Sequence, residues 1–478
     1  MTQTGTEADG ATVAFPAPAG QQTVVSLVPD NLVAFALRAL SARAAARTLD
    51  LQYYIWDEDV TGRLLIREVL RAADRGVRVR LLLDDLYVRR TERALATLAR
   101  HPSIEVRLYN PFRLRSLGWL GDAIEFLCAG YRLNHRMHNK SWIVDGHLVI
   151  GGGRNVGDQY FDASSQFNFR DLDLLVAGGA ASQALANFDR YWINRRVRPI
   201  DQIAASRPVE GGLDALRRRL AAAATQASAP AYLQRLRALP KLAELLERRR
   251  TWLNTEQVRI VADPPDKGYG RRRSPDMLNA VHRALHGARK RVLLISPYFV
   301  PGRRGTRSLT TLARRGVRVS VLTNSLAATD VLAVHGGYAR YRRRLLRAGV
   351  ELHELKRGGQ QGQSLFGSGR ASLHTKAFAV DGELAFVGSF NLDPRSAYLN
   401  TEMGTFVHHP GLAGELSEEF ARLTAPTRSW TVGLERGRLA WTDRAEGRAR
   451  TLHREPDASL SRRVLARVLG WLPIEPQL

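Results

Sequence analysis

The chain has 478 residues, 44% of them hydrophobic, which is enough for two domains with full cores and excludes an intrinsically disordered protein. Lysine and arginine outnumber aspartate and glutamate by 71 to 46, so the formal net charge of +25 favours a polyanionic partner, either nucleic acid or an anionic membrane face. Cys128 is the only cysteine, which excludes a disulfide framework, and we expect it to be a small buried apolar residue.

The N-terminal region does not resemble a secretory signal, because the first basic residue is Arg38 and no apolar stretch follows a charged start. No stretch approaches 18 uninterrupted apolar residues, so no transmembrane helix is predicted. We therefore expect a protein kept in the reducing cytoplasm, and attachment to a membrane surface is left open.

The predicted elements follow a loose N-terminal tail that is rich in threonine, alanine, glycine and proline. The first half predicts a strand from Val24, a helix through Arg47, a strand at 49–54, a helix at 63–75 and a strand at 77–83. The second half repeats that order over 258–262, 275–288, 292–296, a helix ending at Arg315, and 317–323. This alternation predicts βαβ units, a mainly parallel sheet and the α/β class.

This order divides the chain into five predicted parts. They are a flexible tail at 1–22, a first α/β domain at 23–205, a basic helical connection at 206–255, a second α/β domain at 256–425, and a C-terminal extension at 426–478.

Three segments outside the repeated elements each fit two interpretations. The connection carries Arg217–Arg219 and Arg248–Arg250, and it is either a solvated linker or a basic surface for anionic lipid. The stretch Leu117–Tyr131 is either core or a wall that faces acyl chains. The C-terminal extension has an amphipathic helix that either packs on the body or lies in a membrane interface, and its apolar face comprises Leu460, Val464, Leu465, Val468, Leu469 and Leu472.

Two segments that lie 236 residues apart carry the same motif of six positions. The first comprises His138, Lys140, Asp145, Gly152-Gly153 and Asn155, and the second comprises His374, Lys376, Asp381, Gly388-Ser389 and Asn391. An Arg-Gly-Val-Arg-Val sequence also repeats, at 75–79 and at 315–319. Self-similarity on this scale predicts two homologous halves that pack with pseudo-twofold symmetry, each donating one motif to an active site at their interface.

Each motif predicts a β-hairpin, because an Asp-Gly pair separates two apolar runs. The histidine and lysine are two residues apart on the entering strand and therefore face the same side. The returning strand brings the Gly-Gly or Gly-Ser pair and the asparagine back to the start of the motif.

Two histidines, two lysines and two asparagines at one point suit the chemistry of a phosphodiester. Lys140, Lys376, Asn155 and Asn391 can bind the phosphoryl oxygens as negative charge builds on them. One imidazole can attack phosphorus to form a phosphohistidine, and the other can protonate the leaving alkoxide and then deprotonate the acceptor. This chemistry predicts no metal and no cofactor. Lysine is rare in this chain, with six against 65 arginines, yet it occupies both motif positions.

Four carboxylates accompany the motifs. Asp171 and Glu402 each follow a motif histidine by about 30 residues, and we predict that they orient the histidines. Asp145 and Asp381 belong to the motif and are counted with the catalytic residues, although an aspartate in an Asp-Gly turn usually serves the turn, so a structural role is favoured for both.

These motifs resemble those of the phospholipase D superfamily, whose signature is His-x-Lys-x4-Asp followed by Gly-Gly/Ser and Asn. Further sequence, including Leu51–Trp56, Phe169–Asp173, Ser296–Pro301 and Leu472–Glu475, resembles the C type of bacterial cardiolipin synthase from about residue 23 onward. The resemblance implies transfer of a phosphatidyl group onto phosphatidylglycerol, with phosphatidylethanolamine or a second phosphatidylglycerol as donor. It also implies peripheral attachment to an anionic phospholipid membrane, at the cytoplasmic face of the inner membrane, and no nucleic acid partner.

We expect His138 to be the nucleophile and His374 the acid and base, although the internal symmetry leaves their order open. Two alternatives are kept. One is a hydrolase of the same superfamily, either a phospholipase or a nuclease. The other is a catalytically inactive binder, which conflicts with two intact motifs.

Overall fold

The computed structural model describes residues 22–203, 208–223, 225, 229–239, 252–269, 275–358, 371–444 and 450–478. Most of the predicted tail at 1–22, part of the connection at 206–255, and Arg248–Arg250 lie outside these residues. Within the described part of the chain, no helix is long and apolar enough to cross a membrane.

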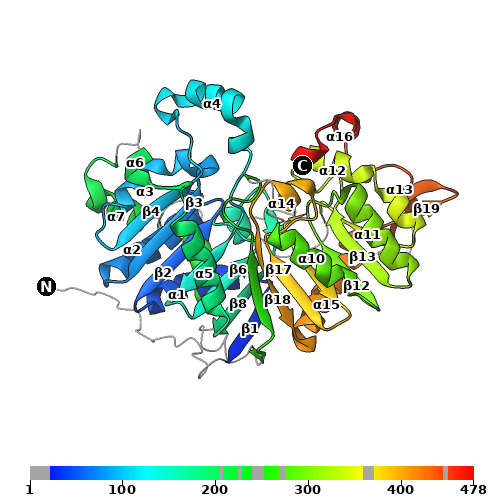
Figure 1. Cartoon of the computed structure of the whole chain (residues 1–478), viewed down its shortest axis with the longest axis horizontal. Coiled ribbons are helices and arrows are strands. Elements are labelled where there is room, and N and C mark those ends of the chain that lie inside the picture. The colour runs from blue at the N-terminus through cyan, green and yellow to red at the C-terminus, as the bar shows by residue number, and fades with distance from the viewer. Residues whose placement is uncertain are drawn as a thin grey trace.

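Two large sheets lie side by side, one from each half of the chain (Figure 1). The first has the order β10 (Leu253–Asn254), β1 (Thr23–Val28), β8 (Asp173–Gly178), β6 (Leu148–Gly152), β5 (Ser141–Val144), β2 (Thr48–Tyr53), β3 (Arg78–Asp84), β4 (Ile104–Tyr109) and β9 (Val197–Pro199). The second has the order β11 (Val258–Ala262), β18 (Met403–His408), β17 (Leu384–Gly388), β16 (Ala377–Val380), β12 (Arg291–Ile295), β13 (Arg318–Asn324), β14 (Glu351–Leu355), β19 (Ser429–Glu435), β20 (Arg438–Asp443) and β21 (Arg450–Leu452).

The two orders correspond strand for strand from β1 to β9 and from β11 to β19. The predicted α/β class and the two homologous halves are therefore confirmed. The predicted C-terminal extension at 426–478 begins with β19, β20 and β21, which continue the second sheet.

The prediction of a mainly parallel sheet is wrong. Only β2, β3 and β4, and their counterparts β12, β13 and β14, pair in parallel among the described strands of the two large sheets. The motif hairpins β5–β6 and β16–β17 insert beside β2 and β12, and hairpin strands pair antiparallel.

Helices cover both sheets. The helices of the first half and the connection are α1 (Asn31–Ala44), α2 (Val60–Asp74), α3 (Glu92–Leu98), α4 (Gly118–Leu133), α5 (Ala181–Trp192), α6 (Ile200–Ile203), α7 (Gly212–Ala223) and α8 (Ala229–Ala238). Those of the second half are α10 (Asp276–His286), α11 (Gly302–Arg314), α12 (Leu332–Ala339), α13 (Arg342–Arg347), α14 (Pro394–Tyr398), α15 (Pro410–Thr424) and α16 (Leu460–Trp471).

One hydrophobic core is shared by the two halves. It joins apolar side chains of β1, β6 and β8 to side chains of β11, β17 and β18, which meet at the centre of the molecule (Figure 1). The buried faces of α5 and α15 complete it, with Phe188 and Phe420 among their contributions. Hydrogen bonds also cross the boundary, because the Tyr191 hydroxyl donates to the carbonyl of Asp263 at 2.7 Å. The halves are therefore fixed against each other.

The two motif aspartates close their hairpins. Asp145 and Asp381 have φ of 51° and 55°, and the following glycines have φ of 74° and 76°, as a tight hairpin turn requires. The Asp381 carboxylate accepts three backbone N–H groups, from residues 289, 290 and 291, at 2.7–2.8 Å. Asp145 does the same for residues 46, 47 and 48. Both lie at the end of the entering strand that is remote from the histidine, and we propose a structural role for both.

We expect Asp381→Asn to lower the free energy of unfolding by about 1–2 kcal/mol, because one amide oxygen replaces two carboxylate oxygens that accept three donors. Urea unfolding measures this change, and turnover per folded molecule should be nearly unaffected. Glu383→Gln is the matched control, since it removes the same charge from an exposed side chain two residues away. A turnover loss that exceeds the stability loss would contradict the structural role.

Candidate active site

The segment that leads into each motif pairs with the opposite half of the molecule. β15 (Ala371–Leu373), which leads into the second motif, pairs in parallel with β7 (Asn168–Arg170) of the first half. In the same way Met137, which precedes His138, forms a parallel bridge with Thr401 of the second half. The His138 N–H donates to the Thr401 carbonyl at 2.9 Å, and the His374 N–H donates to the Arg170 carbonyl at 2.8 Å. These backbone bonds therefore place His138 beside the residue after Thr401 and His374 beside the residue after Arg170.

That next residue is one of the two predicted orienting carboxylates. Nδ1 of His138 lies 2.8 Å from Oε2 of Glu402, and Nδ1 of His374 lies 2.6 Å from Oδ2 of Asp171. Both pairs join the halves, across 264 and 203 residues of sequence. All four side chains are buried. In both pairs the carboxylate contacts Nδ1 of the imidazole. Nε2 is therefore the ring nitrogen that the carboxylate does not contact.

The two lysines share this buried space with the histidines. Nζ of Lys140 donates to the carbonyl of His138 at 2.7 Å, and Nζ of Lys376 donates to the carbonyl of His374 at 2.5 Å. The ring of Tyr54 contacts both members of the first pair, with its centroid 5.1 Å from the His138 ring and 5.4 Å from Nζ of Lys140. The histidine and lysine of one motif thus face the same side of the strand, as their spacing predicts.

The two motif asparagines differ in their contacts. The amide of Asn155 donates to the Tyr160 hydroxyl at 2.9 Å and accepts from the N–H of residue 55 at 3.2 Å. The Tyr160 ring in turn lies 5.2 Å from the His374 ring. The side-chain oxygen of Asn391 is buried and has no hydrogen-bond partner within the described protein. Asn155 therefore holds Tyr160, whose ring packs against His374. Phosphate binding by both asparagines stays a prediction.

The electrostatics of the site favour an anion. Burial, together with Lys140 and Lys376, lowers the pKa of His138 well below its usual value. Burial and Lys376 lower the pKa of His374 to about 4. Burial also lowers the pKa of Lys376 to about 8, and that of Lys140 well below its usual value. Lost hydration is the largest cause of all four shifts, and the negative charge of a phosphate group among these side chains would raise all four pKa values.

The two carboxylates are not equivalent. Burial raises the pKa of Glu402 to about 7. Burial would also raise the pKa of Asp171, but His374 and Lys376 outweigh it and lower that pKa below its usual value. Asp171 is therefore the more firmly ionised partner.

The model of the family described as "Cardiolipin synthase, PLD-like domain" matches the chain twice, over residues 40–192 and 281–424. These matches cover more than half of the chain. The chain belongs to this family. It is 42% identical to cardiolipin synthase C of Escherichia coli over 93% of this chain and 94% of that protein. It is 26% identical to a cardiolipin synthase of Geobacillus kaustophilus over 79% of this chain and 61% of that protein.

A solved structure has the same fold. The phosphatidylserine synthase of Haemophilus influenzae superimposes with a TM-score of 0.62 at 13% identity, covering 96% of this chain and 97% of that one. Two phospholipase D-like halves with the active site between them are thus the architecture of this family member.

Two residues that position the motif strands were missed by sequence reasoning. The Asp84 carboxylate accepts the N–H of Met137 at 2.8 Å, and burial raises its pKa to about 6. In the other half Asn324 accepts the N–H of Leu373 at 2.9 Å and donates to its carbonyl at 3.0 Å. The 240-residue register of the repeated Arg-Gly-Val-Arg-Val sequence relates Asp84 to Asn324 and would have identified both.

The Gly-Gly and Gly-Ser variants of the motif reflect the different carboxylates. A Cβ atom at Gly153 would lie 2.2 Å from Oδ1 of Asp171, so only glycine fits there without a shift. At the matching position the Ser389 hydroxyl donates to Glu402 and accepts from the N–H of Met403. The serine therefore holds the longer carboxylate in place.

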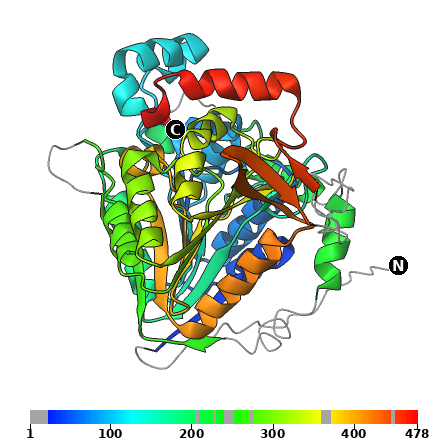
Figure 2. The same ribbon diagram turned by 90° about the vertical axis from the view of Figure 1, so that its right-hand side faces the viewer.

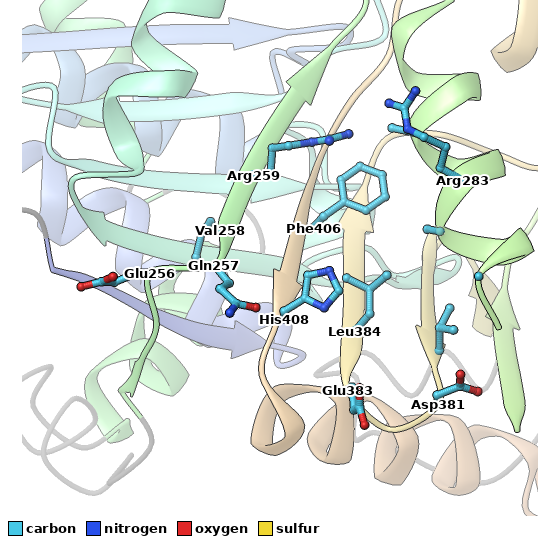
Figure 3. Close-up of a pocket in the computed structure, with 14 residues that line it drawn as sticks. Glu256, Gln257, Val258, Arg259, Arg283, Asp381, Glu383, Leu384, Phe406 and His408 are labelled. Atoms are coloured by element: carbon cyan, nitrogen blue, oxygen red, sulfur yellow. The ribbon is translucent and has the colours of Figure 1, made fainter. Parts of the chain in front are cut away.

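A groove on another part of the surface is separate from the paired histidines. It has a volume of about 620 Å³ and lies beside α10, over the ends of β11, β17 and β18 (Figure 3). Its lining includes Arg259, Arg283, Asp381 and His408 but neither motif histidine. The presence of Asp381 places it at the hairpin turn, away from the paired histidines.

We expect inorganic phosphate to bind more weakly as the pH rises above about 8, because Lys376 then loses the proton that the anion requires. Binding at about pH 8 to 9 should take up protons, since the bound anion restores the ammonium form. Calorimetry in two buffers of different protonation enthalpy measures this uptake. Lys376→Met should weaken binding and reduce the uptake, whereas affinity that does not change with pH would contradict the low pKa.

Proposed function

We propose that this chain is a phosphatidyltransferase that makes cardiolipin from phosphatidylglycerol and a second phospholipid, through a covalent phosphatidyl-histidine. Two cross-half histidine–carboxylate contacts beside two buried lysines are the main support, because they provide a nucleophile, an acid and an anion site at one point. The 42% identity to a cardiolipin synthase supports the substrate class. Phosphatidylethanolamine and phosphatidylglycerol are both candidate donors.

In the first step Nε2 of His138 attacks the phosphorus of the donor lipid. Glu402 accepts the hydrogen bond from Nδ1 and so keeps the lone pair on Nε2. As the P–N bond forms, the P–O bond to the headgroup alcohol breaks, and His374 gives its proton to that leaving oxygen. Lys140 and Lys376 stabilise the charge on the phosphoryl oxygens. The products are phosphatidyl-His138 and the free alcohol, glycerol or ethanolamine.

In the second step His374 acts as the base. It takes the proton from a free hydroxyl of phosphatidylglycerol, whose oxygen attacks phosphorus and displaces Nε2 of His138. The new diester is cardiolipin, and the enzyme returns to its starting state with His374 protonated. Asn155 and Asn391 help to hold the phosphoryl group in both steps.

Electrostatics support this order of the two histidines. His374 faces the firmly ionised Asp171, and its pKa falls only to about 4, whereas the pKa of His138 falls well below its usual value. The histidine beside the stronger anion holds a proton more readily and suits the acid. The negative charge of the bound lipid phosphate raises both pKa values, so His374 takes up the proton first and His138 suits the nucleophile.

The same site could pass the phosphatidyl group to water. A phospholipase or nuclease would use identical first-step chemistry, but the high identity to a cardiolipin synthase over most of both chains favours transfer to a lipid alcohol. We further propose that the enzyme is peripheral and works at the cytoplasmic face of the inner membrane, where its anionic phospholipid substrates lie.

We expect His138→Ala to abolish any covalent intermediate, because no atom remains to bond phosphorus. His374→Ala should slow transfer from phosphatidylglycerol by roughly 10²–10⁴-fold, yet still label His138 with a nitrophenyl phosphatidyl ester, whose leaving group needs no proton. Peptide mapping of trapped phosphohistidine measures both. Label on His374 that is absent from His138 would reverse the assignment.

Lys140→Ala and Lys376→Ala should each lower turnover by roughly 10²–10³-fold, since each removes charge stabilisation from the same transition state. Because these lysines supply the positive charge, EDTA should leave cardiolipin synthesis nearly unchanged. Thin-layer separation of the lipid products, with and without chelator, is the measurement. Activity that is lost with EDTA and restored by Mg²⁺ at the chemical step would contradict this mechanism.

A further inference from the structure

Helix α4 exposes its apolar side rather than burying it. Leu127 is 85% exposed and Trp119 is 76% exposed. Leu120, Ile124 and Leu127 follow the spacing of one helical face, and Leu117, just before the helix, and Tyr131, beyond a kink at Ala129, are exposed as well. The sequence of this stretch fits either core packing or a wall that faces acyl chains, and core packing is wrong for these exposed residues. Cys128, expected to be buried, is exposed on the same helix.

The inner side of α4 is polar. The Glu125 carboxylate is buried and accepts the backbone N–H groups of Arg113 and Leu114 at 2.6 and 3.0 Å, and it pairs with Arg132. A helix that turns its acid inward and its leucines outward is inverted relative to an ordinary surface helix. Its outer face therefore lacks the partner that such an apolar area requires.

Helix α16 is inverted in the same way. Its inner side is held by polar contacts, because Nε of Arg462 donates to the carbonyl of Leu326 at 2.8 Å and Nη2 of Arg463 donates to that of Glu455 at 2.8 Å. Ala466 and Gly470 are buried against Gly336 of α12, where a Cβ would lie 2.5 Å from the Ala466 carbonyl oxygen. The outer side carries Leu460, Val464, Leu465, Val468, Trp471 and Leu472, with Leu460 74% and Trp471 76% exposed.

The two helices lie at one end of the molecule, as both views show (Figures 1 and 2). This end also carries the histidines, since α4 ends at Leu133 and His138 follows five residues later. A hydrogen-bond cluster joins the helices to the site. Arg395 of α14 donates to the Asn134 side chain at 2.9 Å, and its N–H donates to the carbonyl of Leu478 at 2.6 Å. Asn134, which directly follows α4, and Leu478, which lies seven residues beyond the end of α16, are thus tied to the same arginine.

We propose that the outer faces of α4 and α16 together form a docking surface for an anionic lipid bilayer, with the histidine pair at the same end of the molecule. The docking surface deepens the proposed function, on which it rests for the lipid nature of the substrates.

Charge supports a bilayer as the occupant. A groove of about 710 Å³ runs along α16, and its lining includes five exposed arginines, Arg340, Arg343, Arg438, Arg454 and Arg467, together with Trp471. Cationic side chains beside an apolar helix face, with tryptophan at the boundary, match the headgroup and acyl regions of an anionic leaflet.

The basic connection contributes less to such a surface than its sequence indicates. Arg217 pairs with Asp74 and Asp214, and Arg219 pairs with Glu58 on the body of the protein. These ion pairs neutralise part of the Arg217–Arg219 cluster.

Vesicle binding tests the docking surface. The variants Trp119→Ser/Leu127→Ser and Leu460→Ser/Trp471→Ser should each reduce co-sedimentation with phosphatidylglycerol–phosphatidylcholine vesicles by about tenfold or more, because two large apolar side chains no longer leave water. Ile193→Ser is the matched control, since Ile193 is 80% exposed but lies on neither helix. It should bind as the parent does. Parent-like binding by both double variants would overturn the docking surface.

The single cysteine provides a second measurement on the unmutated chain. An environment-sensitive fluorophore on Cys128 should shift to shorter wavelength when phosphatidylglycerol vesicles are added, and added salt should weaken the shift. Vesicles of phosphatidylcholine alone should give a smaller shift. No shift with anionic vesicles would overturn the proposal for α4.

Two further outcomes separate the docking surface from its alternatives. The first is the oligomeric state without lipid. If the parent is a dimer and both double variants are monomers, the two helices form an interface between copies of the chain, and the proposal is overturned. The second is the reaction rate on two forms of substrate. The double variants should match the parent rate on soluble short-chain phosphatidylglycerol and lose activity on vesicles. Loss of activity on both substrates would overturn the docking surface. If the parent binds vesicles through these helices but makes no cardiolipin, the proposed function fails and the docking surface stands.

Discussion

Backbone pairing between the halves, just before each motif histidine, is the constraint on which the rest of the structure depends. The residues that lead into each motif pair with backbone of the other half, so each histidine meets a carboxylate that its own half does not supply. Buried carboxylates and imidazoles without partners would cost several kcal/mol each. The shared core of α5, α15 and the central strands therefore stabilises the fold and the catalytic geometry together.

The site buries two lysines beside its two histidines. Lys140 and Lys376 lie within the same enclosed space as two histidines, and burial lowers the pKa of both lysines. Burial makes the charged form of both lysines unfavourable, Asp171 and Glu402 offset part of that cost, and an entering anion offsets more of it. A phosphodiester supplies that charge and leaves its phosphorus beside a ring nitrogen, so binding and activation have the same physical origin.

The two halves have nearly the same backbone, but the side chains around their histidines differ. Asp171 and Glu402 occupy matching places but differ in length, and the neighbouring Gly153 and Ser389 differ to suit them. The shorter carboxylate stays ionised and the longer one tends toward protonation. One backbone plan thus provides two histidines in unlike electrostatic surroundings, as a reaction with a nucleophile and an acid needs.

The sequence by itself determined the local features: the two halves, the hairpins with their Asp-Gly turns, and the histidines and lysines that share a side. These follow from periodicity and from turn chemistry within a few residues. Only the tertiary structure decided that Asp171 serves His374 and that Glu402 serves His138, because those partners are 203 and 264 residues apart. It also decided that the apolar faces of α4 and α16 point outward, since a pattern shows which side of a helix is apolar but not what lies against it.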